Sequence, residues 1–239
     1  MIIENVPSVV HSSENVTSRA KAALVSAGYG CFEAVVDVSN LGIPQKRRRH
    51  LLIAMHGVQS EEVASVVGPI ALQRKPPGVM SFIRDLQDRI DDVDPMLATT
   101  RISADNKARI EYLFSRDAYD LPNEYRPACH RDKNHSYLSM YGRMQPDKPA
   151  QTITSGFGSM GQGRFVHPTR PRMITAREAA RIQGFPDYFS FSEVSSRSAL
   201  RDMIANAVPP ALSAAVTSLM MSTRKAYMDS SRLPTAFSI

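Results

Sequence analysis

The sequence has no tryptophan, few cysteines and no long hydrophobic run. Only two of its 239 residues are cysteines, Cys31 and Cys129, which excludes a disulfide framework and a four-thiolate zinc site. No stretch approaches the roughly 18 consecutive apolar residues of a membrane-spanning helix. Residues 1–5 lack the basic start and the apolar stretch of a signal peptide. We therefore expect a cytoplasmic protein that spans no membrane.

A zinc site of mixed ligands is not expected either. Cys129, His130 and His135 lie close together in the sequence, but one thiol and two imidazoles leave a four-coordinate site one ligand short. No second Cys/His pair lies near them. The sequence therefore predicts no metal site.

The composition that remains suits a globular protein with an anionic partner. Hydrophobic residues make up 43% of the chain and charged residues 22%, which is enough apolar material for a core. Lys and Arg number 29 against 23 Asp and Glu, which gives a net charge of +6. This excess fits a polyanion such as nucleic acid without requiring one.

The N-terminal part predicts the closing portion of an α/β sheet. Residues 1–3 are apolar, like the end of a buried strand, and a helix with a serine N-cap at residues 12–13 should end at Gly28. Two strands are expected next, over 33–38 and 51–55. The order strand, helix, strand, strand is typical of an α/β sheet.

The pattern weakens after Gly57 and sharpens again in the last third. Short helices are expected near 80–90 and 105–115, among prolines and polar residues. Thr175 and Glu178 form a capping box that should begin a helix ending at Gln183. A further helix is expected after the two prolines at 209–210.

The densest charge cluster is Gln-Lys-Arg-Arg-Arg-His at residues 45–50. If the chain is extended over 43–53, Gln45, Arg47 and Arg49 lie on one face, because side chains alternate along a strand. Three such donors can hold a phosphate or the carbonyl edge of a base. A solvated basic turn or a localisation signal is the alternative.

Glu4 follows the apolar start of the chain. The ligand crevice of an open α/β sheet lies beyond the carboxyl ends of its strands. A partly desolvated carboxylic acid there can donate a proton. The alternative is an exposed glutamate near a chain terminus.

Residues 156–161 match Gly-x-Gly-x-x-Gly by letter and follow a strand-like segment. A dinucleotide fold would continue into a helix, but the chain instead reads Gly-Arg-Phe-Val-His-Pro. We interpret this glycine loop, with Thr154 and Arg164 beside it, as backbone that approaches a nucleic-acid phosphate. A purely structural turn is the alternative.

Residues 164–181 contain five arginines and a single acidic residue among them, Glu178. They form either a DNA-facing basic stretch or a set of stems that pack on a helix and pair with surface acids. The five are Arg164, Arg170, Arg172, Arg177 and Arg181.

Four segments, taken in order, resemble the C-terminal part of the DNA (cytosine-5) methyltransferase family. The family's Glu-Asn-Val motif is matched by residues 4–6. Its Gln-x-Arg-x-Arg motif, usually preceded by Gly-(Val/Ile)-Pro, is matched by residues 42–49. Its ninth motif resembles residues 172–187, and its tenth, Gly-Asn-(Ser/Ala)-Val-Pro-Pro, is matched by residues 205–210. The resemblance spans about residues 1–222.

The resemblance implies an α/β fold, namely the C-terminal part of a methyltransferase (Rossmann-like) sheet plus a small mixed target-recognition domain. Residues 1–57 would end the catalytic domain, 58–172 would form the target-recognition domain, and 173–239 would close the fold with helices that pack back on the catalytic domain. The implied cofactor is S-adenosylmethionine, and the implied partner is double-stranded DNA.

The resemblance also implies roles for individual residues. The target cytosine is flipped out of the duplex, a cysteine thiolate attacks C6, and the cofactor's methyl group goes to C5. Glu4 would hydrogen-bond and protonate N3 of the cytosine. Arg49 and Arg47, oriented by Gln45, would grip the base carbonyl and the neighbouring backbone.

Two further groups of residues complete the expected site. Asn206 and Ala207 would border the cofactor pocket. The DNA contacts are expected to come from Lys46, Thr154, Gly156 and Arg164.

The chain departs from the family at the motifs that carry the chemistry. The cofactor loop Phe-x-Gly-x-Gly and the nucleophile motif Pro-Cys-Gln have no counterpart, and Ala205 replaces a glycine. A thiolate nucleophile needs an activating site, which neither Cys31 nor Cys129 has by sequence. We therefore expect no methyl transfer by this chain alone, and activity only with a second chain or N-terminal segment. The alternatives are a non-catalytic, sequence-selective DNA-binding module and an inactive truncated fragment.

Overall fold

The computed structural model describes residues 1–71, 75–132, 139–194 and 196–230, which form two compact units. Unit 1 comprises residues 1–41, 48–71 and 210–230. Unit 2 comprises residues 42–47 and the described residues from 75 to 209. Each unit has its own sheet and its own core.

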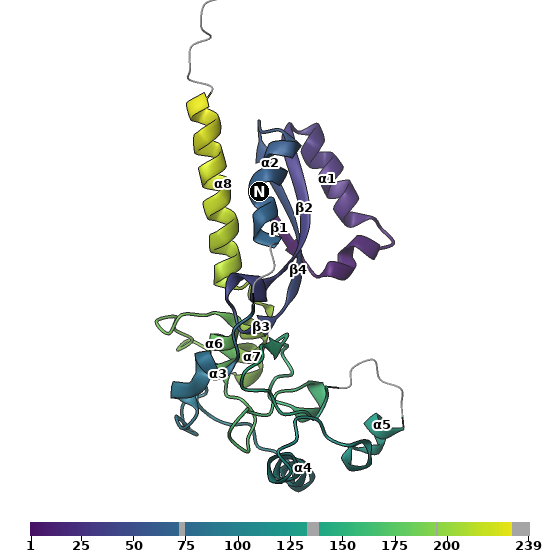
Figure 1. The fold of residues 1–239 in the computed structure, drawn as a ribbon, viewed down its shortest axis with the longest axis vertical. Coiled ribbons are helices and arrows are strands. Elements are labelled where there is room, and N and C mark those ends of the chain that lie inside the picture. The colour runs from purple at the N-terminus through teal and green to yellow at the C-terminus, as the bar shows by residue number, and fades with distance from the viewer. Residues whose placement is uncertain (72–74, 133–138, 195, 231–239) are drawn as a thin grey trace, which may run out of the picture. The chain divides into compact units, whose positions relative to one another are not determined.

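Unit 1 is built on a three-stranded sheet (Figure 1). Its strands, in spatial order, are β1 (Ile2–Asn5), β4 (Arg48–His56) and β2 (Tyr29–Asp37), and β4 runs antiparallel to both neighbours. Ile53 of β4 lies opposite Ile2 on one side and Phe32 on the other. The expected order of strand, helix, strand, strand is confirmed, although both later strands begin earlier than predicted.

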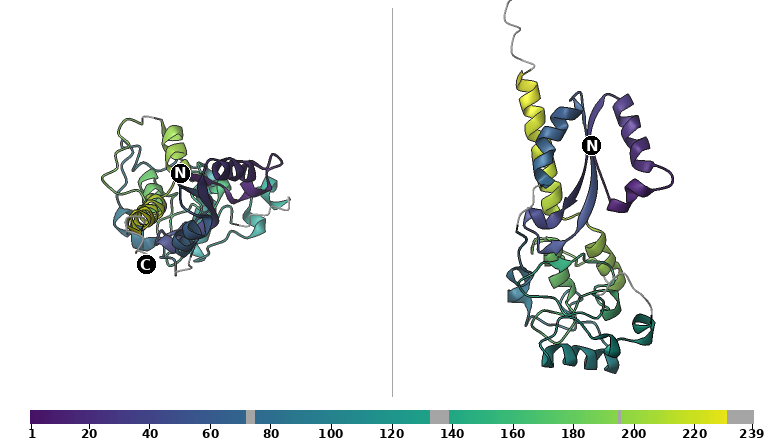
Figure 2. Two further views of the ribbon diagram at one scale, coloured as in Figure 1. Left: turned by 90° about the horizontal axis from the view of Figure 1, so that it is seen from above. Right: turned by 45° about the vertical axis from the view of Figure 1, so that its right-hand side comes forward.

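Helices cover both faces of this sheet. α1 (Val16–Ser26) lies on one face and α2 (Ser60–Val67) on the other, where α8 (Pro210–Ser230) packs beside α2 (Figure 2). The central residues of β4, Leu51–Met55, are consequently all buried. A strand covered on both faces carries a continuous apolar run rather than an alternating one. The predicted helix after Pro209 is thereby confirmed, and it packs within unit 1.

β1 is an edge strand whose apolar side chains remain exposed. Met1 is 56%, Ile2 41% and Ile3 38% exposed, whereas the paired residues of β4 are buried. Only one side of β1 is paired in the described part of the chain. An edge of this kind is a template for a further strand.

The start of α1 differs from the prediction. The helix begins at Val16 with Asn15 as N-cap, not at a serine, and Asn15 makes no capping hydrogen bond. The Ser12 hydroxyl instead accepts a hydrogen bond from the backbone N–H of Glu14 at 3.3 Å. A local turn after the 3-10 helix over Pro7–His11 has therefore taken the serine that the sequence offered as a cap.

Unit 2 is mostly irregular chain around short helices. Its two strands, β3 (Gln45–Lys46) and β5 (Ala150–Gln151), pair in parallel. The predicted helix near 80–90 is shorter than expected and ends in a 3-10 turn over Arg84–Leu86, whereas the one near 105–115 is confirmed. Its helices are α3 (Met80–Ile83), α4 (Ala104–Ser115), α5 (Ala128–Arg131), α6 (Ala176–Gln183) and α7 (Arg197–Asn206).

α6 begins as the sequence predicts. Thr175 Oγ1 accepts a hydrogen bond from the backbone N–H of Glu178, and the Glu178 carboxylate accepts one from the N–H of Thr175. This reciprocal pair is the capping box. α7 was not predicted. Ser196 caps this helix, and its buried residues Leu200 and Ile204 have helical spacing.

The two units follow other boundaries than the expected 1–57, 58–172 and 173–239. In the expected closing segment, 173–239, the described residues from 173 to 209 belong to unit 2. The described residues from 210 to 230 belong to unit 1. The reason is packing, because Ile182 and Ile204 are buried in the same core as Val79 and Phe165. The recognition role expected for 58–172 stays a prediction.

The chain is not continuously extended over 43–53. It pairs as β3 at Gln45–Lys46, leaves that sheet at Arg47, and pairs as β4 from Arg48. Gln45 and Arg47 therefore belong to unit 2, whereas Arg49 belongs to unit 1. The expected common face of these three side chains does not form along one strand.

By length and composition, one stretch of the described residues, Arg197–Arg224, is apolar enough to cross a membrane. It is not a single helix, because residues 207–209 separate α7 from α8. This stretch is weak evidence for a membrane span.

Candidate functional site

Gln45 lies at the centre of a buried hydrogen-bond network in unit 2. Its side chain is fully buried, and its Nε2 donates to Oε1 of Gln183 at 2.5 Å. Its Oε1 accepts from the backbone N–H of Ile153 at 2.8 Å. Gln45 thus joins β3 to the last residue of α6 and to the segment after β5.

Arg47 extends this network to the segment that follows α7. It is 2% exposed, and its guanidinium donates to the carbonyl oxygens of Ile153 at 3.2 Å, Ala205 at 2.9 Å and Ala207 at 3.3 Å. Gln183 Nε2 donates to two of the same carbonyls, those of Ala205 and Ala207. The backbone around Asn206 is therefore held by two side chains.

This network changes the expected role of Gln45 and Arg47. Their polar groups are directed into the protein, where they satisfy buried carbonyls that would otherwise cost free energy. The Arg47 guanidinium thus contacts the backbone on either side of Asn206, and its expected contact with a base stays a prediction. The network joins three of the four segments that the sequence singled out, through residues that all lie in unit 2.

Glu4 and Arg49 form an ion pair in unit 1. Arg49 Nε lies 2.5 Å from Glu4 Oε1, and the two side chains are 12% and 24% exposed respectively. The contact arises because β1 and β4 are paired, with Glu4 opposite Leu51 and Arg49 two residues away. The structure therefore brings these two predicted catalytic residues together.

Three of the four predicted DNA contacts line one cleft of about 720 Å³ in unit 2. We call it the Lys46 cleft. Its described lining residues include no Asp or Glu; they are Lys46, Ser139, Met140, Gln151, Thr152, Thr154, Ser155, Gly156, Gln162 and Gly163. A cleft with hydroxyls, amides and one cation suits an anionic ligand.

Arg164, the fourth predicted contact, does not line this cleft. Its guanidinium donates to the carbonyl oxygens of Tyr119 at 2.6 Å and Arg143 at 3.2 Å, and it pairs with Asp120. It therefore fixes the surrounding chain of unit 2. The expectation that it stands beside Thr154 as a phosphate contact is not supported by this geometry.

Three further arginines of the basic stretch are also paired with acids. Arg170 pairs with Asp88, Arg172 with Glu178, and Arg181 with Asp85 and Asp187. The hydrogen bond from Arg181 holds the pKa of Asp187 below its usual value. For Arg164, Arg170, Arg172 and Arg181 the structure shows the pairing with acids, whereas Arg177 forms no ion pair with a described residue.

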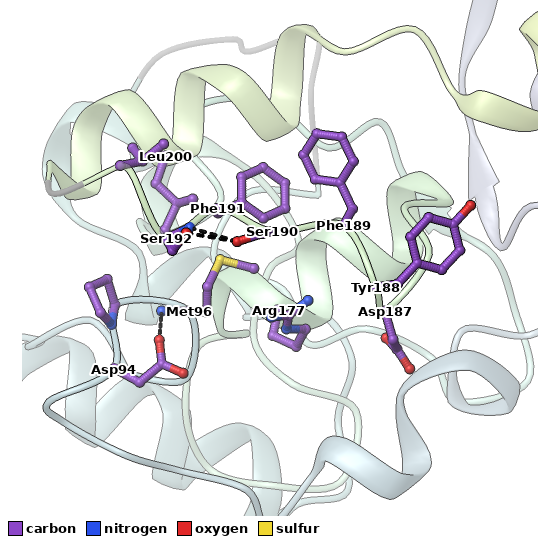
Figure 3. Close-up of a pocket in the computed structure, with 12 residues that line it drawn as sticks. Asp94, Met96, Arg177, Asp187, Tyr188, Phe189, Ser190, Phe191, Ser192 and Leu200 are labelled. Carbon is purple, nitrogen blue, oxygen red and sulfur yellow. Dashed lines mark hydrogen bonds between the residues drawn. The ribbon is translucent and has the colours of Figure 1, made fainter.

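Arg177 lines a second pocket of unit 2, of about 330 Å³ (Figure 3). Among the described residues its guanidinium has no hydrogen-bond partner. Phe189 and Phe191 form one wall, with ring centroids 4.9 Å apart, and the Ser190 and Ser192 hydroxyls lie 2.8 Å from each other. No sequence motif indicated this pocket.

The predicted cofactor residues lie at the end of α7. Asn206 is exposed and Ala207 is partly exposed, while their backbone is held from the inside by Arg47 and Gln183. An exposed amide on a fixed backbone fits the role of a border residue. The described chain offers no glycine loop beside it that matches the family's cofactor loop.

A buried charge cluster in unit 2 was missed by the sequence reading. Glu178 is 0% exposed and receives two hydrogen bonds from Arg172, at 2.7 and 2.9 Å. His167 Nε2 lies 3.3 Å from the same carboxylate, while its Nδ1 accepts from the backbone N–H groups of Thr169 and Arg170. Burial alone would raise the pKa of Glu178, but the hydrogen bonds from Arg172 and His167 outweigh it and hold the pKa below its usual value.

Cys31 does not have the surroundings of a nucleophile. Cys31 is buried in β2, and burial raises the pKa of its thiol, which disfavours the thiolate. Cys129 is exposed near the start of α5. His135, the third residue of the sequence's Cys/His group, lies outside the described residues.

The fold is that of the methyltransferases. The chain superposes on the Schizosaccharomyces pombe Dnmt2 methyltransferase with a TM-score of 0.57 at 16% identity, covering 94% of this chain and 66% of that one. It superposes with the same TM-score of 0.57, at 21% identity, on a putative DNA modification methyltransferase encoded within an Escherichia coli prophage, covering 94% and 69%. The expected fold class is confirmed.

The chain belongs to the C-5 cytosine-specific DNA methylase family, whose model matches residues 1–222. It is 43% identical over 217 residues to the type II methyltransferase M1.BsuMI of Bacillus subtilis, covering 89% of this chain and 49% of that protein. It is 33% identical to the type II methylase M.HgiDII of Herpetosiphon aurantiacus, covering 88% and 61%. The chain thus spans about half the length of the relatives it matches.

Proposed function

We propose that this chain is one part of an enzyme that transfers a methyl group from S-adenosylmethionine to C5 of cytosine in a specific double-stranded DNA site. The observation that carries the proposal is the hydrogen-bond network that joins three family segments through Gln45, Arg47 and Gln183. This network fixes the backbone around Asn206, which in the proposal borders the cofactor pocket. Bound S-adenosylmethionine would supply the electrophilic methyl group.

In this proposal Glu4 is the catalytic residue that the chain contributes. With the cytosine flipped out of the duplex, the carboxyl group of Glu4 would hold N3 and supply its proton, which makes C6 electrophilic. Arg49 positions that carboxyl group through the 2.5 Å contact in unit 1. Arg47 acts at a distance from the base, because it is buried against carbonyl oxygens.

The missing chemistry would come from a further segment that carries Phe-x-Gly-x-Gly and Pro-Cys-Gln. This part of the proposal is supported by the absence of both motifs from the sequence and by the half-length match to relatives. It is supported as well by the unpaired edge of β1 with exposed Ile2 and Ile3. A strand of the completing segment would pair along that edge.

DNA would contact unit 2 at the Lys46 cleft. Lys46 would pair with a phosphate, while the Thr154 hydroxyl and the backbone at Gly156 would donate to neighbouring oxygens. The cleft carries no acidic side chain among its described lining residues, so no negative charge on its wall repels the phosphates.

A complementation assay tests the proposal. The full chain is mixed with the part of the Bacillus subtilis relative that it does not cover, and transfer of a labelled methyl group to duplex DNA is measured. We expect transfer from the mixture and none from either part alone. Glu4→Gln should lower the rate at least about a hundredfold, the lower range for a general acid. A soluble, folded mixture that transfers no methyl group would contradict the proposal.

A non-catalytic DNA-binding module is the second candidate, favoured by the absence of Pro-Cys-Gln and by the acid-free cleft. It predicts sequence-selective and salt-dependent binding of duplex DNA that Glu4→Gln leaves unchanged. Selective binding without any methyl transfer from the mixture would favour this candidate.

A further inference from the structure

The loop that forms the floor of the Lys46 cleft is held rigidly. Phe157 and Met160 are buried in the core of unit 2, at 2% and 1% exposure. Consecutive backbone hydrogen bonds run from Phe157 N–H to Thr154 and from Ser159 N–H to Gly156. The backbone from which the cleft-lining side chains of this loop project is therefore fixed in position.

Gln162 lies across Gly156. A Cβ atom at residue 156 would come 2.6 Å from Gln162 Cβ and 2.7 Å from its Cγ. These atoms are close to the backbone and cannot move away cheaply, so only glycine fits at residue 156. The stem of Gln162 is thus held against Gly156, and Gln162 is one of the residues that line the cleft.

The second amide of the cleft is already committed. Gln151 Oε1 accepts a hydrogen bond from Ser139 Oγ at 2.9 Å, and its Nε2 occupies the space that a Cβ at Gly163 would need. Among the described residues, the Gln162 amide has no hydrogen-bond partner. Of the Gln151 and Gln162 amides, only that of Gln162 has both its oxygen acceptor and its N–H donors available to a ligand among the described residues.

The chemistry of an amide distinguishes the ligand that Gln162 suits. A phosphate only accepts hydrogen bonds, so it would leave the amide oxygen unused. The major-groove edge of adenine offers an acceptor at N7 and a donor at N6, which a glutamine amide matches in two parallel hydrogen bonds.

We propose that Gln162 determines specificity for one A·T pair of the recognised DNA by contacting the adenine edge from the Lys46 cleft. The inference rests on the proposed function, because it takes DNA as the ligand of this cleft. Lys46 then contributes affinity without sequence preference, and Gln162 contributes sequence preference at one position.

The test is selection from a pool of randomised duplexes by the full chain, alone and with the completing segment. Gln162→Met keeps the stem that packs on Gly156 but removes the amide. We expect the wild-type chain to enrich sites with one fixed A·T pair, and the variant to lose the preference at that position by roughly 5- to 100-fold. Gln145→Met, at a glutamine outside the cleft, should leave the selected sites unchanged.

Two comparisons separate this inference from the function on which it rests. Lys46→Ala should weaken binding uniformly and reduce the dependence of log affinity on log salt by about one. If Lys46→Ala does so while Gln162→Met selects the same sites as the wild type, the role of Gln162 is wrong and the proposed function stands. A uniform loss from Gln162→Met, or a lost preference at a G·C pair, also overturns it. Absence of any selection by the wild-type chain in both conditions overturns both.

Discussion

At the scale of single residues, the polar side chains of unit 2 are mostly structural. Arg47, Gln183 and Glu178 are each buried or nearly so, and each is satisfied by backbone or by an opposite charge. A buried polar group without a partner costs free energy, so these residues could not be replaced singly without loss. Residues with polar groups toward solvent or a cleft, such as Gln162, are the ones left for ligands.

Glu178→Gln should destabilise the chain by about 3 kcal/mol at pH 7, because it removes the buried carboxylate and leaves the partly buried Arg172 guanidinium without its charge partner. Urea unfolding of both proteins measures this difference. Glu193→Gln, at an exposed glutamate, is the matched control and should change the free energy of unfolding by less than about 0.5 kcal/mol. Equal losses from both variants would contradict the role of the buried cluster.

The difference in unfolding free energy between the wild type and Glu178→Gln should depend on pH. The folded-state pKa of Glu178 lies below its ordinary value of 4.5, so its stabilisation is fully present above about pH 4.5 and is lost as the pH falls through the folded-state value. We expect the difference in unfolding free energy between wild type and Glu178→Gln to be constant from pH 7 to about 5.5 and to narrow below 4.5. A difference that widens on acidification would show that the carboxylate is not stabilised by its partners.

At the scale of elements, caps and network contacts fix where the last helices begin and end. Thr175→Ala removes half of the capping box of α6 and should cost about 1 kcal/mol, with 2 kcal/mol as the upper range for a buried cap. Thermal or urea unfolding measures it. Ser196→Ala at the exposed cap of α7 is the comparison, and we expect a smaller loss there. A larger loss of stability from Ser196→Ala than from Thr175→Ala would contradict this prediction.

Gln183→Leu should loosen the segment after α7 in particular. The substitution removes the hydrogen bonds to the carbonyl oxygens of Ile204, Ala205 and Ala207. It leaves Gln45 Nε2 with only the Ile182 carbonyl oxygen, at 3.5 Å. We expect a loss of at least about 2 kcal/mol and faster hydrogen exchange of the backbone amides of residues 204–208. Gln145→Leu serves as the control. Unchanged exchange in this segment would mean that Arg47 alone holds it.

At the scale of the whole molecule, the proposed completing segment would pair along the edge of β1 that is unpaired in the described part of the chain. Ile3→Lys places a charge on this edge, where Ile3 is 38% exposed, and should leave the stability of the chain itself nearly unchanged. It should weaken association with the completing segment at least about tenfold, measured by calorimetry or by the rate of the complemented reaction. Val25→Lys, on the exposed side of α1, should not. Equal affinities for both variants would place the completing segment elsewhere.

Periodicity and local chemistry indicated several elements correctly. The capping box at Thr175, the helix after Pro209 and the strands of unit 1 follow from patterns within about ten residues. The start of α1 was predicted wrongly, because the Ser12 hydroxyl accepts a hydrogen bond in a turn before the helix. α7 was overlooked although Ser196 and the spacing of Leu200 and Ile204 signalled it.

The site residues divide in the same way. The family motifs pointed to Glu4 and Arg49, and pairing of β1 with β4 brings them together. The spacing of Gln45, Arg47 and Arg49 suggested one shared face, but the chain changes sheets at Arg47. The sequence could not show this, because the partners of Gln45 and Arg47 lie more than a hundred residues away.

What the sequence by itself determined is therefore local and chemical: which segments form helices and strands, which family the motifs resemble, and which catalytic motifs the chain does not contain. What only the tertiary structure decided is which polar groups remain available. Arg47, Arg164 and Arg172 are alike in the sequence as basic residues, yet each donates hydrogen bonds to carbonyl oxygens that are distant in the sequence. The physical reason is that burial forces every polar group to find a partner, and the fold alone determines which partners are near.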